Sequence, residues 1–358
     1  MRPIGLIAGI IIAALTSVAA ASDTVSFPEV RPGVSFSFPA DHGAHPQFRN
    51  EWWYITGWLK RADGSPIGFQ VTFFRVRSGL GEDNPSAFAA KQILFAHAAL
   101  SDPKLGHLLH QERIYRAGFG LAQAATGDAD VVIGDWTLKR SVDGRFHTLV
   151  GGKDFTLDLT FTPAQAVLPE GENGYSRKGP RPGDASHYYS LPHLAVTGHV
   201  LRDGKNEMVT GSAWLDREWS SSYLDPDAAG WDWTGLNLDG GGALMAFRIR
   251  DHAGSTLWAG GTLREANGAI HVLAPGDVQF TPVRKWRSAQ SGATYPVEMT
   301  LGLRLPDGVR QWQLTPLFDN QEYDARMTGG PIYWEGAVRS NGATGYLELT
   351  GYFQPLRM

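Results

Sequence analysis

The chain has 358 residues, a hydrophobic fraction of 42% and a formal net charge of −4 at pH 7. This length suffices for about two packed domains, and the weak negative charge argues against nucleic acid as a partner. Cysteine is absent, which excludes disulfides, thiol nucleophiles and thiolate metal ligands. The 43 glycines and 12 tryptophans, together with the scarcity of helical patterns, favour an all-β fold.

Residues 1–21 have the features of a secretory signal peptide. Arg2 supplies the positive end, residues 4–18 are uncharged and mostly apolar, and residues 19–21 are three alanines that fit a cleavage site. The alternative is an uncleaved anchor, because the uncharged run of residues 3–22 is about long enough to span a bilayer. The alanines favour the signal peptide. We therefore expect a periplasmic or secreted protein, and the absence of cysteine excludes a lipoprotein.

Several segments alternate apolar and polar side chains, which is the period-two pattern of antiparallel strands with one buried face. The alternation is clearest over residues 155–161, 245–250 and 347–353. Many hairpin-type turn pairs separate such segments, which predicts a meandering barrel or sandwich. Residues 84–94 are the best candidate for a helix. The turn pairs are Asp63-Gly64, Asp143-Gly144, Asp203-Gly204, Asp239-Gly240, Asn267-Gly268, Asp307-Gly308 and Asn341-Gly342.

A faint internal repeat indicates two similar β-domains. Residues 54–59 lead through a turn to a strand that ends in Phe74-Arg75. Residues 233–238 lead in the same way to a strand that ends in Phe247-Arg248. We expect the boundary near residues 220–231. The expected domains are residues 22–222 and residues 223–358.

A glutamate lies directly beside three aromatic residues in the run Glu51-Trp52-Trp53-Tyr54. By strand parity Glu51 shares one face with Trp53, while Trp52 and Tyr54 share the other. A carboxyl group that faces inward with Trp53 is buried and needs a partner. Two interpretations stay open: a catalytic carboxyl whose pKa is raised by burial, or a structural ion pair that pins the strand. The candidate partners are Arg75, His97 and Arg217.

The segment just before this run holds Asp41, His42 and His45. Two histidines three residues apart with an aspartate are a candidate metal-ligand set. However, Gly43 and Pro46 interrupt the segment, and no third strong ligand is adjacent. We favour a hydrogen-bond network in which His45 is a supporting polar residue, and we expect no metal site.

A second acidic cluster, Asp216-Arg217-Glu218-Trp219, lies within an otherwise apolar run. Buried charges are usually paired, so an ion pair of Arg217 with either carboxyl is one interpretation. In the other, one carboxyl is a proton donor or base and the second orients it. No Gly-x-Ser-x-Gly elbow is present, which argues against a serine hydrolase of the α/β class.

Aromatic residues near both clusters predict the wall of a pocket for an apolar ligand, because their rings are large apolar surfaces with faces that attract cations. For Tyr188, packing in the core is the alternative. We expect these rings and the carboxyls to converge on a dry cavity inside a closed barrel, with residues 169–186 crossing one mouth. No phosphate loop or dinucleotide fingerprint is present, so we expect no cofactor. The predicted ligand-binding residues are Trp52, Trp53, Tyr54, Tyr188, Trp219, Trp231 and Trp233.

Taken together, these runs resemble the AttH/CrtC family, which includes carotenoid 1,2-hydratase and exported bacterial members labelled predicted secreted hydrolases. The resemblance covers nearly the whole chain after the signal peptide and implies two lipocalin-like antiparallel β-barrel domains. It also implies a long apolar substrate, because relatives hydrate carotenoids or cyclise polyketide chains. The matching runs are Asp41-His42-Gly43, Glu51-Trp52-Trp53-Tyr54, Phe73-Phe74-Arg75, Ala96-His97-Ala98, Tyr188-Tyr189-Ser190-Leu191-Pro192, Trp214-Leu215-Asp216-Arg217-Glu218-Trp219 and Gly230-Trp231-Asp232-Trp233.

One position departs from the carotenoid hydratases that the chain resembles. They tend to carry histidine between the aspartate and the glutamate, whereas this chain has Arg217, which stays charged and is a poor proton carrier. The first hypothesis is an enzyme that adds water to a lipophilic substrate or hydrolyses it, with Asp216 and Glu218 as acid and base and Glu51 as a further catalytic candidate. The alternative is a non-catalytic carrier of a lipid-like molecule that works with an ABC exporter. Both hypotheses use the same pocket.

Overall fold

The computed structural model describes residues 25–356 except residues 87 and 223. The predicted signal peptide at residues 1–21 lies outside the described residues. The protein is all-β, with two large antiparallel sheets. Within the described part of the chain, no helix has the length and apolar character that a bilayer span requires. The same part of the chain has four 3₁₀ helices, of which η1 (Ala40–His42) precedes the first strand and the other three lie between strands: η2 (Asp239–Gly241), η3 (Pro275–Asp277) and η4 (Arg326–Thr328).

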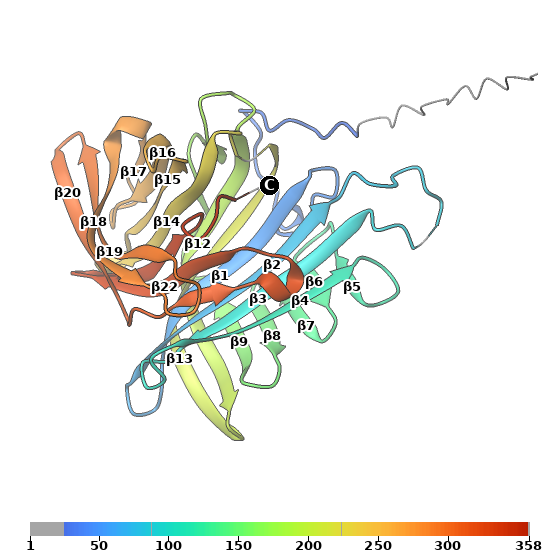
Figure 1. Ribbon diagram of the computed structural model, residues 1–358, viewed down its shortest axis with the longest axis horizontal. Helices are drawn as coiled ribbons and strands as arrows, with labels where there is room; N and C mark the ends of the chain where they lie inside the picture. Colours follow the sequence, from blue (N-terminus) through green and yellow to red (C-terminus); the bar gives the residue numbers. More distant parts are fainter. Residues whose placement is uncertain (1–24, 87, 223, 357–358) are drawn as a thin grey trace, which may run out of the picture.

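The first sheet runs in the order β4-β3-β2-β1-β13-β12-β9-β8-β7-β6-β5, with β10 and β11 paired to β12. The long hairpin of β12 and β13 lies at its centre (Figure 1). Its strands are β1 (Asn50–Lys60), β2 (Pro66–Arg77), β3 (Gln92–Ser101), β4 (Leu108–Arg116), β5 (Ala122–Ala124), β6 (Asp130–Ile133), β7 (Trp136–Arg140), β8 (Phe146–Gly151), β9 (Thr156–Thr162), β10 (Leu168–Pro169), β11 (Tyr175–Arg177), β12 (Ala185–Arg202) and β13 (Lys205–Ser222).

The second sheet runs in the order β17-β16-β15-β14-β23-β22-β20-β19-β18, with β21 paired to β22. It holds the remaining strands of the described chain. These are β14 (Ala228–Leu238), β15 (Ala243–Asp251), β16 (Thr256–Arg264), β17 (Ile270–Leu273), β18 (Val278–Arg287), β19 (Thr294–Leu305), β20 (Gly308–Pro316), β21 (Glu322–Asp324), β22 (Ile332–Ser340) and β23 (Ala343–Leu349).

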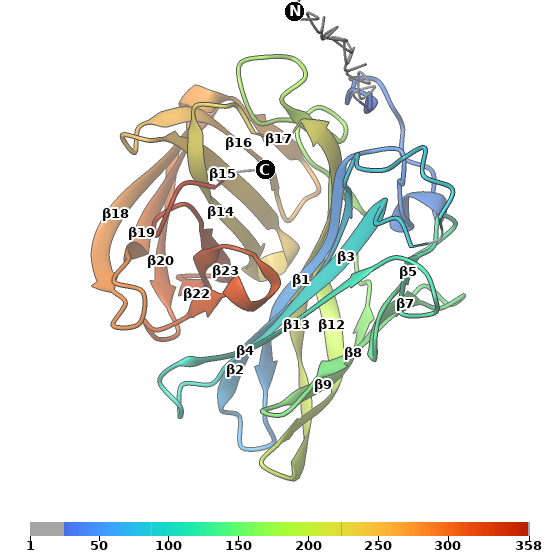
Figure 2. The ribbon, with the colours of Figure 1, turned by 45° about the vertical axis from the view of Figure 1, so that its right-hand side comes forward.

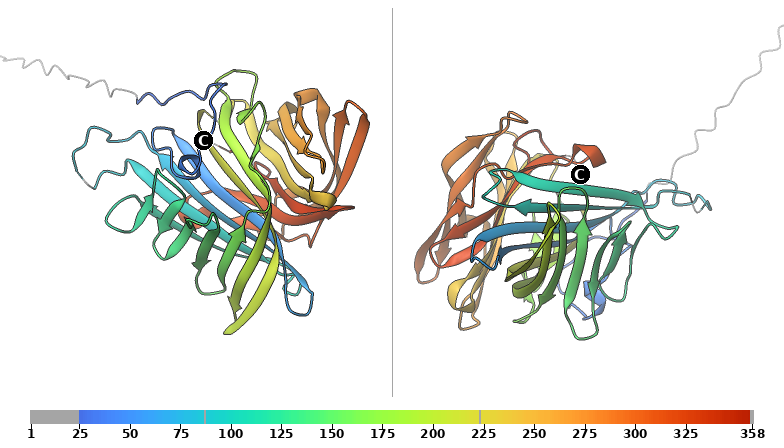
Figure 3. Two further views of the ribbon diagram at one scale, coloured as in Figure 1. Left: turned by 180° about the vertical axis from the view of Figure 1, so that it is seen from behind. Right: turned by 90° about the horizontal axis from the view of Figure 1, so that it is seen from below.

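Each sheet curls until strands from its two ends approach one another. In the first sheet β3 and β4 lie against β6, and in the second sheet β18 lies against β15 and β16. Figure 2 shows the two curled sheets side by side, and Figure 3 shows the same pair from behind and from below. The molecule therefore has the two lipocalin-like β-barrels that the family resemblance implies.

The turn pairs predicted from the sequence all connect neighbouring antiparallel strands. Asp63-Gly64 joins β1 to β2, Asp203-Gly204 joins β12 to β13, and Asn341-Gly342 joins β22 to β23. The other four pairs join β7 to β8, β14 to β15, β16 to β17 and β19 to β20. Gly64, Gly204 and Gly342 have φ angles of 78°, 72° and 73°, a left-handed conformation that glycine adopts without steric cost.

The predicted helix at residues 84–94 is wrong. The described residues before Gln92 form bends and turns, and β3 begins at Gln92. The side chain of Asn84 accepts a hydrogen bond from the backbone of Ser86, and the Ser86 hydroxyl accepts one from the backbone of Phe88. Such local bonds compete with helical ones. The alternation predicted to continue to residue 353 also stops early, because β23 ends at Leu349.

Apolar side chains fill the interior of each barrel. Trp53, Phe69 and Phe73 are fully buried in the core of the first barrel, and Tyr295 and Trp334 are fully buried in that of the second. A third apolar cluster lies between the two sheets and joins residues of both. Its members include Tyr54, Tyr188 and Trp214 from the first sheet and Trp233, Met245 and Phe247 from the second.

Candidate functional site

A cavity lies between the two sheets and outside both cores. The alternation of side chains along the strands determines which residues face it. In β1, Trp53 points into the first barrel, whereas Trp52 and Tyr54 point outward to the second sheet. In β13, Asp216 and Glu218 point to the same outer side. The cavity has a volume of about 340 Å³, which is within the range of small-molecule sites. The expectation of a cavity inside a barrel is wrong, because packed side chains occupy both interiors.

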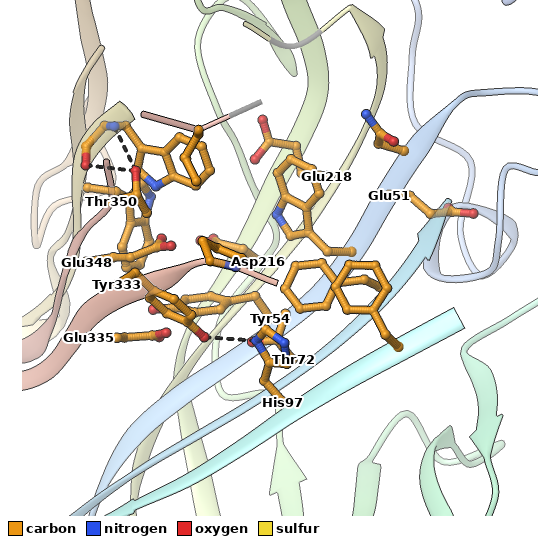
Figure 4. A pocket seen from close by; sticks show the side chains of 18 of the residues that line it. Glu51, Tyr54, Thr72, His97, Asp216, Glu218, Tyr333, Glu335, Glu348 and Thr350 are labelled. Atoms are coloured by element: carbon orange, nitrogen blue, oxygen red, sulfur yellow. Dashed lines mark hydrogen bonds between the residues drawn. The ribbon is translucent and has the colours of Figure 1, made fainter. Parts of the chain in front are cut away.

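The cavity wall combines aromatic rings with carboxyl groups from both sheets. Of the predicted ligand-binding residues, five line it: Trp52, Tyr54, Tyr188, Trp231 and Trp233. Phe74, Phe95 and Tyr333 add to the aromatic surface. Four carboxyl groups border this surface in addition to Glu51, and Figure 4 labels them: Asp216, Glu218, Glu335 and Glu348.

Asp216 is held by three hydrogen bonds. Trp214 Nε1 donates to Oδ1 at 2.6 Å, Tyr188 Oη donates to Oδ2 at 2.7 Å, and Ser190 Oγ lies 2.6 Å from Oδ1. Tyr188 is itself fixed, because Trp233 Nε1 donates to its hydroxyl oxygen at 3.1 Å. These bonds come from β12, β13 and β14, so both barrels set the position of this carboxyl.

The pKa of Asp216 is raised to about 7. Burial is the main cause, and the negative charge of Glu218 adds to it, against the hydrogen bonds from Ser190, Tyr188 and Trp214. Asp216 is only 3% exposed. A carboxyl with this pKa is present in both its protonated and its ionised form near neutral pH, as proton transfer requires.

Glu218 has a different environment from Asp216. Lys178 Nζ lies 3.1 Å from Glu218 Oε1, and the Ser186 hydroxyl donates to the same oxygen. Burial raises the pKa of Glu218, while Lys178 and Ser186 favour its ionised form. Lys178 also lies over two aromatic rings, 4.7 Å from the centre of Tyr188 and 4.2 Å from that of Phe247. Glu218 is therefore the better placed of the two carboxyls to accept a proton.

Glu335 and Glu348 lie directly opposite each other on β22 and β23. Burial raises the pKa of Glu348 to about 7, and the charges of Asp216 and Glu218 add to it. Burial and the charge of Glu348 raise the pKa of Glu335 well above its ordinary value. Like charges at this spacing oppose one another. At neutral pH the second sheet thus presents carboxyl groups that hold protons.

His97 lies at the wall beside Tyr333, on the side of β3. Its Nδ1 is 2.9 Å from the Tyr333 hydroxyl (Figure 4). Burial, followed by the effect of His110, lowers the pKa of His97 to about 3. The imidazole is therefore neutral at physiological pH, and it orients Tyr333 without contributing a positive charge.

Glu51 borders the cavity, but its carboxylate is engaged on the first-barrel side. It forms ion pairs with Arg75 and Arg217 and accepts hydrogen bonds from the His45 backbone N–H at 3.0 and 2.9 Å. Burial alone would raise the pKa of Glu51, but Arg217, His45 and Arg75 together hold it far below its ordinary value. Figure 4 shows this carboxylate turned away from Asp216. The geometry favours the structural ion pair over the catalytic role.

Trp53 and Trp219 do not line the cavity, contrary to their assignment to the pocket wall. Both point into the first barrel, because they alternate with the cavity-facing Trp52 and Glu218 along their strands. Trp219 stacks on His45 with ring centres 3.8 Å apart. Arg217 lies 3.9 Å from the ring centre of Trp53. The arginine that departs from the hydratase pattern therefore faces away from the cavity.

The loop that carries Asp41, His42 and His45 packs against the core of the first barrel. His45 Nε2 lies 3.0 Å from Asp41 Oδ1, and His42 Nδ1 lies 2.6 Å from the Tyr189 hydroxyl. Trp53 Nε1 donates to the His42 carbonyl at 2.7 Å. The residues form a hydrogen-bond network, and the described residues contain no group of three metal-ligating side chains suited to an ion.

Several residues of the site carry no signal that the sequence analysis could use. Glu170 and Lys178 come from the loop region that was expected only to cross a barrel mouth. Glu348 lies on the polar face of an alternating segment, where parity alone marks it as outward-facing. No sequence signal shows that this outward face meets the first barrel. Ser190 and Trp214 lie in runs that carry the family resemblance, but the sequence assigned them no role in the site. The remaining unpredicted residues are Ser186, Tyr333 and Glu335.

Two barrels with an aromatic cavity between them, lined by several carboxyl groups, define a two-domain, lipocalin-like β-protein with a site between its domains. The chain belongs to the AttH-like family, whose model matches residues 29–352. The comparison with curated proteins finds no match.

Two solved structures have the same architecture. One is a Nitrosomonas europaea protein assigned to AttH, with 50% sequence identity and a TM-score of 0.84, and the match covers 91% of this chain and 100% of that one. The other is kievitone hydratase from Nectria haematococca, with 15% identity and a TM-score of 0.61, and it covers 92% of this chain and 99% of that one. At 15% identity the second likeness concerns the fold alone.

Proposed function

We propose that this protein hydrates a carbon–carbon double bond of an isoprenoid-like, lipophilic substrate in the cavity between its two barrels. One observation carries the proposal: Asp216, with a pKa of about 7, borders a cavity of about 340 Å³ that is walled by tryptophan and tyrosine. Protonating an alkene requires an acid that still holds its proton near neutral pH. The aromatic faces suit the carbocation that this step creates.

In the proposed reaction Asp216 gives its proton to the less substituted alkene carbon. The alkene electron pair forms the new C–H bond and leaves a tertiary cation facing the ring faces of Trp52, Trp231 and Trp233. A water molecule adds its oxygen to the cation, and Glu218, which its Lys178 partner favours in the ionised form, accepts the released proton. The substrate gains one water, and return of the proton to Asp216 completes the cycle.

Membership of the AttH-like family is consistent with this chemistry, as is the fold shared with a protein named for hydratase activity. Hydration needs only an acid, a base and one water. Hydrolysis through a serine elbow lacks its motif in this chain. We place the reaction outside the cytoplasm, on the basis of the signal-like residues 1–21.

The test uses a linear isoprenoid with a terminal gem-dimethyl double bond in water enriched in oxygen-18. We expect a tertiary alcohol that carries the heavy oxygen, detected by mass spectrometry. D216N and E218Q should each lower the rate by about 10²–10⁴-fold while changing the affinity for the isoprenoid much less. D227N, which changes an exposed aspartate, is the control and should react as the wild type does.

The pH dependence gives a second readout. Because Asp216 must be protonated, kcat/KM should decline about tenfold per pH unit above its pKa of about 7. If the isoprenoid binds with high affinity but is recovered unchanged, or if D216N is as active as the wild type, the hydratase proposal fails. Tight binding without turnover would support the carrier.

A further inference from the structure

The Ser190 hydroxyl lies between two buried carboxyl groups. Its Oγ is 2.6 Å from Asp216 Oδ1 and 2.7 Å from Glu170 Oε1. A hydroxyl has one hydrogen and can donate it to only one of these oxygens. The other carboxyl must then hold a proton and donate it to Oγ, because two ionised carboxylates would leave one short oxygen–oxygen contact without a hydrogen. The geometry therefore implies one proton shared by the pair.

The strands place these three side chains together. Ser190 on β12 lies directly opposite Asp216 on β13 and, on its other edge, opposite Leu168 on β10. Glu170 follows β10 at once and stays attached to β12, because its backbone N–H donates to the Tyr188 carbonyl at 3.0 Å. Glu170 and Ser190 are fully buried. The juxtaposition is thus fixed by the pairing of strands.

The hydrogen bonds around the two carboxyls differ. Asp216 accepts two further hydrogen bonds, from Trp214 and Tyr188, which stabilise its ionised form. Among the described residues, Oε2 of Glu170 has no hydrogen-bond partner at normal geometry. An ionised carboxylate left in that state is costly. When the pair holds one proton, Glu170 is therefore the group that keeps it.

The charges that face Glu170 act in both directions, because a negative charge favours its protonated form and a positive charge favours its ionised form. They are Asp216 on β13, Lys178 in the loop after β11 and Arg264 on β16. Burial, with the charge of Asp216 adding to it, raises the pKa of Glu170 to about 8, against the nearby hydroxyl groups of Thr262 and Ser190 and the charge of Lys178.

We infer that Glu170 is a proton store for Asp216 and exchanges a proton with it through the Ser190 hydroxyl. In the transfer, the O–H bond of Glu170 breaks as Ser190 Oγ takes the hydrogen, and the former Ser190 O–H bond breaks as Asp216 Oδ1 takes its hydrogen. Ser190 ends as a hydroxyl, Glu170 as a carboxylate and Asp216 as a neutral acid. Glu170 acts only through Asp216, so it is a positioning residue. The use of this proton in hydration rests on the proposed function; the sharing of the proton does not.

The sharing can be measured without any substrate. Infrared spectroscopy follows the carbonyl stretch of protonated carboxylic acids as pH rises, with E170Q and D216N identifying the two bands. In the wild type we expect two coupled deprotonations. In E170Q the Glu170 band should vanish and the Asp216 step should stay near its wild-type pH, because Glu170 is still neutral when Asp216 ionises. In D216N the Glu170 step should move to lower pH by about one unit, a tenfold change, because the charge of Asp216 no longer opposes its ionisation. E172Q, an exposed glutamate in the same loop, should leave both steps in place.

Ser190 variants test the route. The Ser190 hydroxyl stabilises the singly protonated pair, so S190A should reduce the pH difference between the first and the second deprotonation. S190T keeps a hydroxyl and should restore that difference. If D216N leaves the Glu170 step where it was, or if S190A titrates as the wild type does, the inference is overturned. Should S190A fail to fold, the pH of the Glu170 step in D216N decides the matter.

Kinetics separate this inference from the proposed function. If the protein is a hydratase, E170Q should lower kcat about tenfold or more and change KM little, because Glu170 does not line the cavity. If no isoprenoid is hydrated but the titration shows coupled steps, the proton store stands and the hydratase proposal fails. If hydration occurs at the wild-type rate in E170Q, the store has no role in it and this inference fails alone.

Discussion

At the scale of single residues, Glu51 and Asp216 show how one functional group acquires opposite properties on two faces of a sheet. Glu51 meets two arginines on the barrel side, and its pKa is held low. Asp216 meets hydroxyl and indole groups on the cavity side, and its pKa is raised to about 7. The nature of the partner, and not burial alone, decides which carboxyl can supply a proton.

E51Q should destabilise the protein by about 3–5 kcal/mol, because it leaves Arg75 and Arg217 buried without their anionic partner. E207Q is the control: Glu207 also pairs with an arginine, but its side chain is 41% exposed, and exposed pairs contribute about 1 kcal/mol or less. Urea unfolding measures both. Equal losses in the two variants would contradict the structural role of Glu51.

Buried carboxyl groups whose pKa is raised above the ordinary value in the folded protein should make the folded state less stable as pH rises. For Glu335 the folded pKa lies above the unfolded value, so the folded state binds more protons and stability declines as pH increases from about 4.5 upward. E335Q cannot ionise, so at pH 8 it should melt at least about 3 °C above the wild type and at pH 5 close to it. Calorimetry at the two pH values checks this. A difference that does not change with pH would contradict it.

The alternation of side chains along a strand is enough to separate Asp216 and Glu218 from Arg217 and Trp219. It does not determine which face meets the cavity, because tryptophans occupy both faces of β1 and β13. The choice depends on where the second sheet lies, which is a property of contacts distant in sequence. Glu170 and Lys178 lie in a loop region without periodicity, so no pattern marks them.

At the scale of elements, the hairpins could be predicted because each depends on a local signal. An Asp-Gly or Asn-Gly pair sets the left-handed turn whatever surrounds it. The helix expected at residues 84–94 failed because Asn84 and Ser86 bind the local backbone. The pairing of β1 with β13 has no local signal, since the two strands are far apart in the chain; the family resemblance implied only that the strands form two lipocalin-like barrels.

Gly57 in β1 shows why a glycine is needed within a strand. A Cβ there would lie 2.6 Å from the Ser212 carbonyl oxygen and 2.7 Å from a ring carbon of Phe69. G57A should cost about 1–3 kcal/mol through overpacking. G302A in β19 is the control, because its nearest contact is an oxygen at 3.9 Å. Thermal unfolding measures the Tm of both variants. An equal decrease in Tm in G57A and G302A would refute this explanation.

At the scale of the whole molecule, the two barrels share one apolar interface and one cavity. Trp58 Nε1 on β1 donates to the Gly345 carbonyl on β23 at 3.0 Å. The Asn237 side chain on β14 donates to the Ala213 carbonyl on β13 at 3.2 Å. Because polar and apolar contacts both cross the interface, we expect the barrels to unfold together.

Met245 tests this coupling, because it is fully buried in the cluster between the sheets. M245A should lower the free energy of unfolding by about 2–5 kcal/mol and keep a single transition. M208A is the control, since Met208 on β13 is 68% exposed. Denaturant unfolding followed by tryptophan fluorescence measures both. Two separate transitions in the wild type would show that the interface does not couple the barrels.

The residues that line the cavity come from two barrels, and each barrel has a hydrophobic core of its own. Substitutions of residues that line the cavity can therefore reshape it while the core of each barrel stays intact. Such an arrangement allows the specificity for apolar ligands to change during evolution by single substitutions, each of which leaves the protein folded.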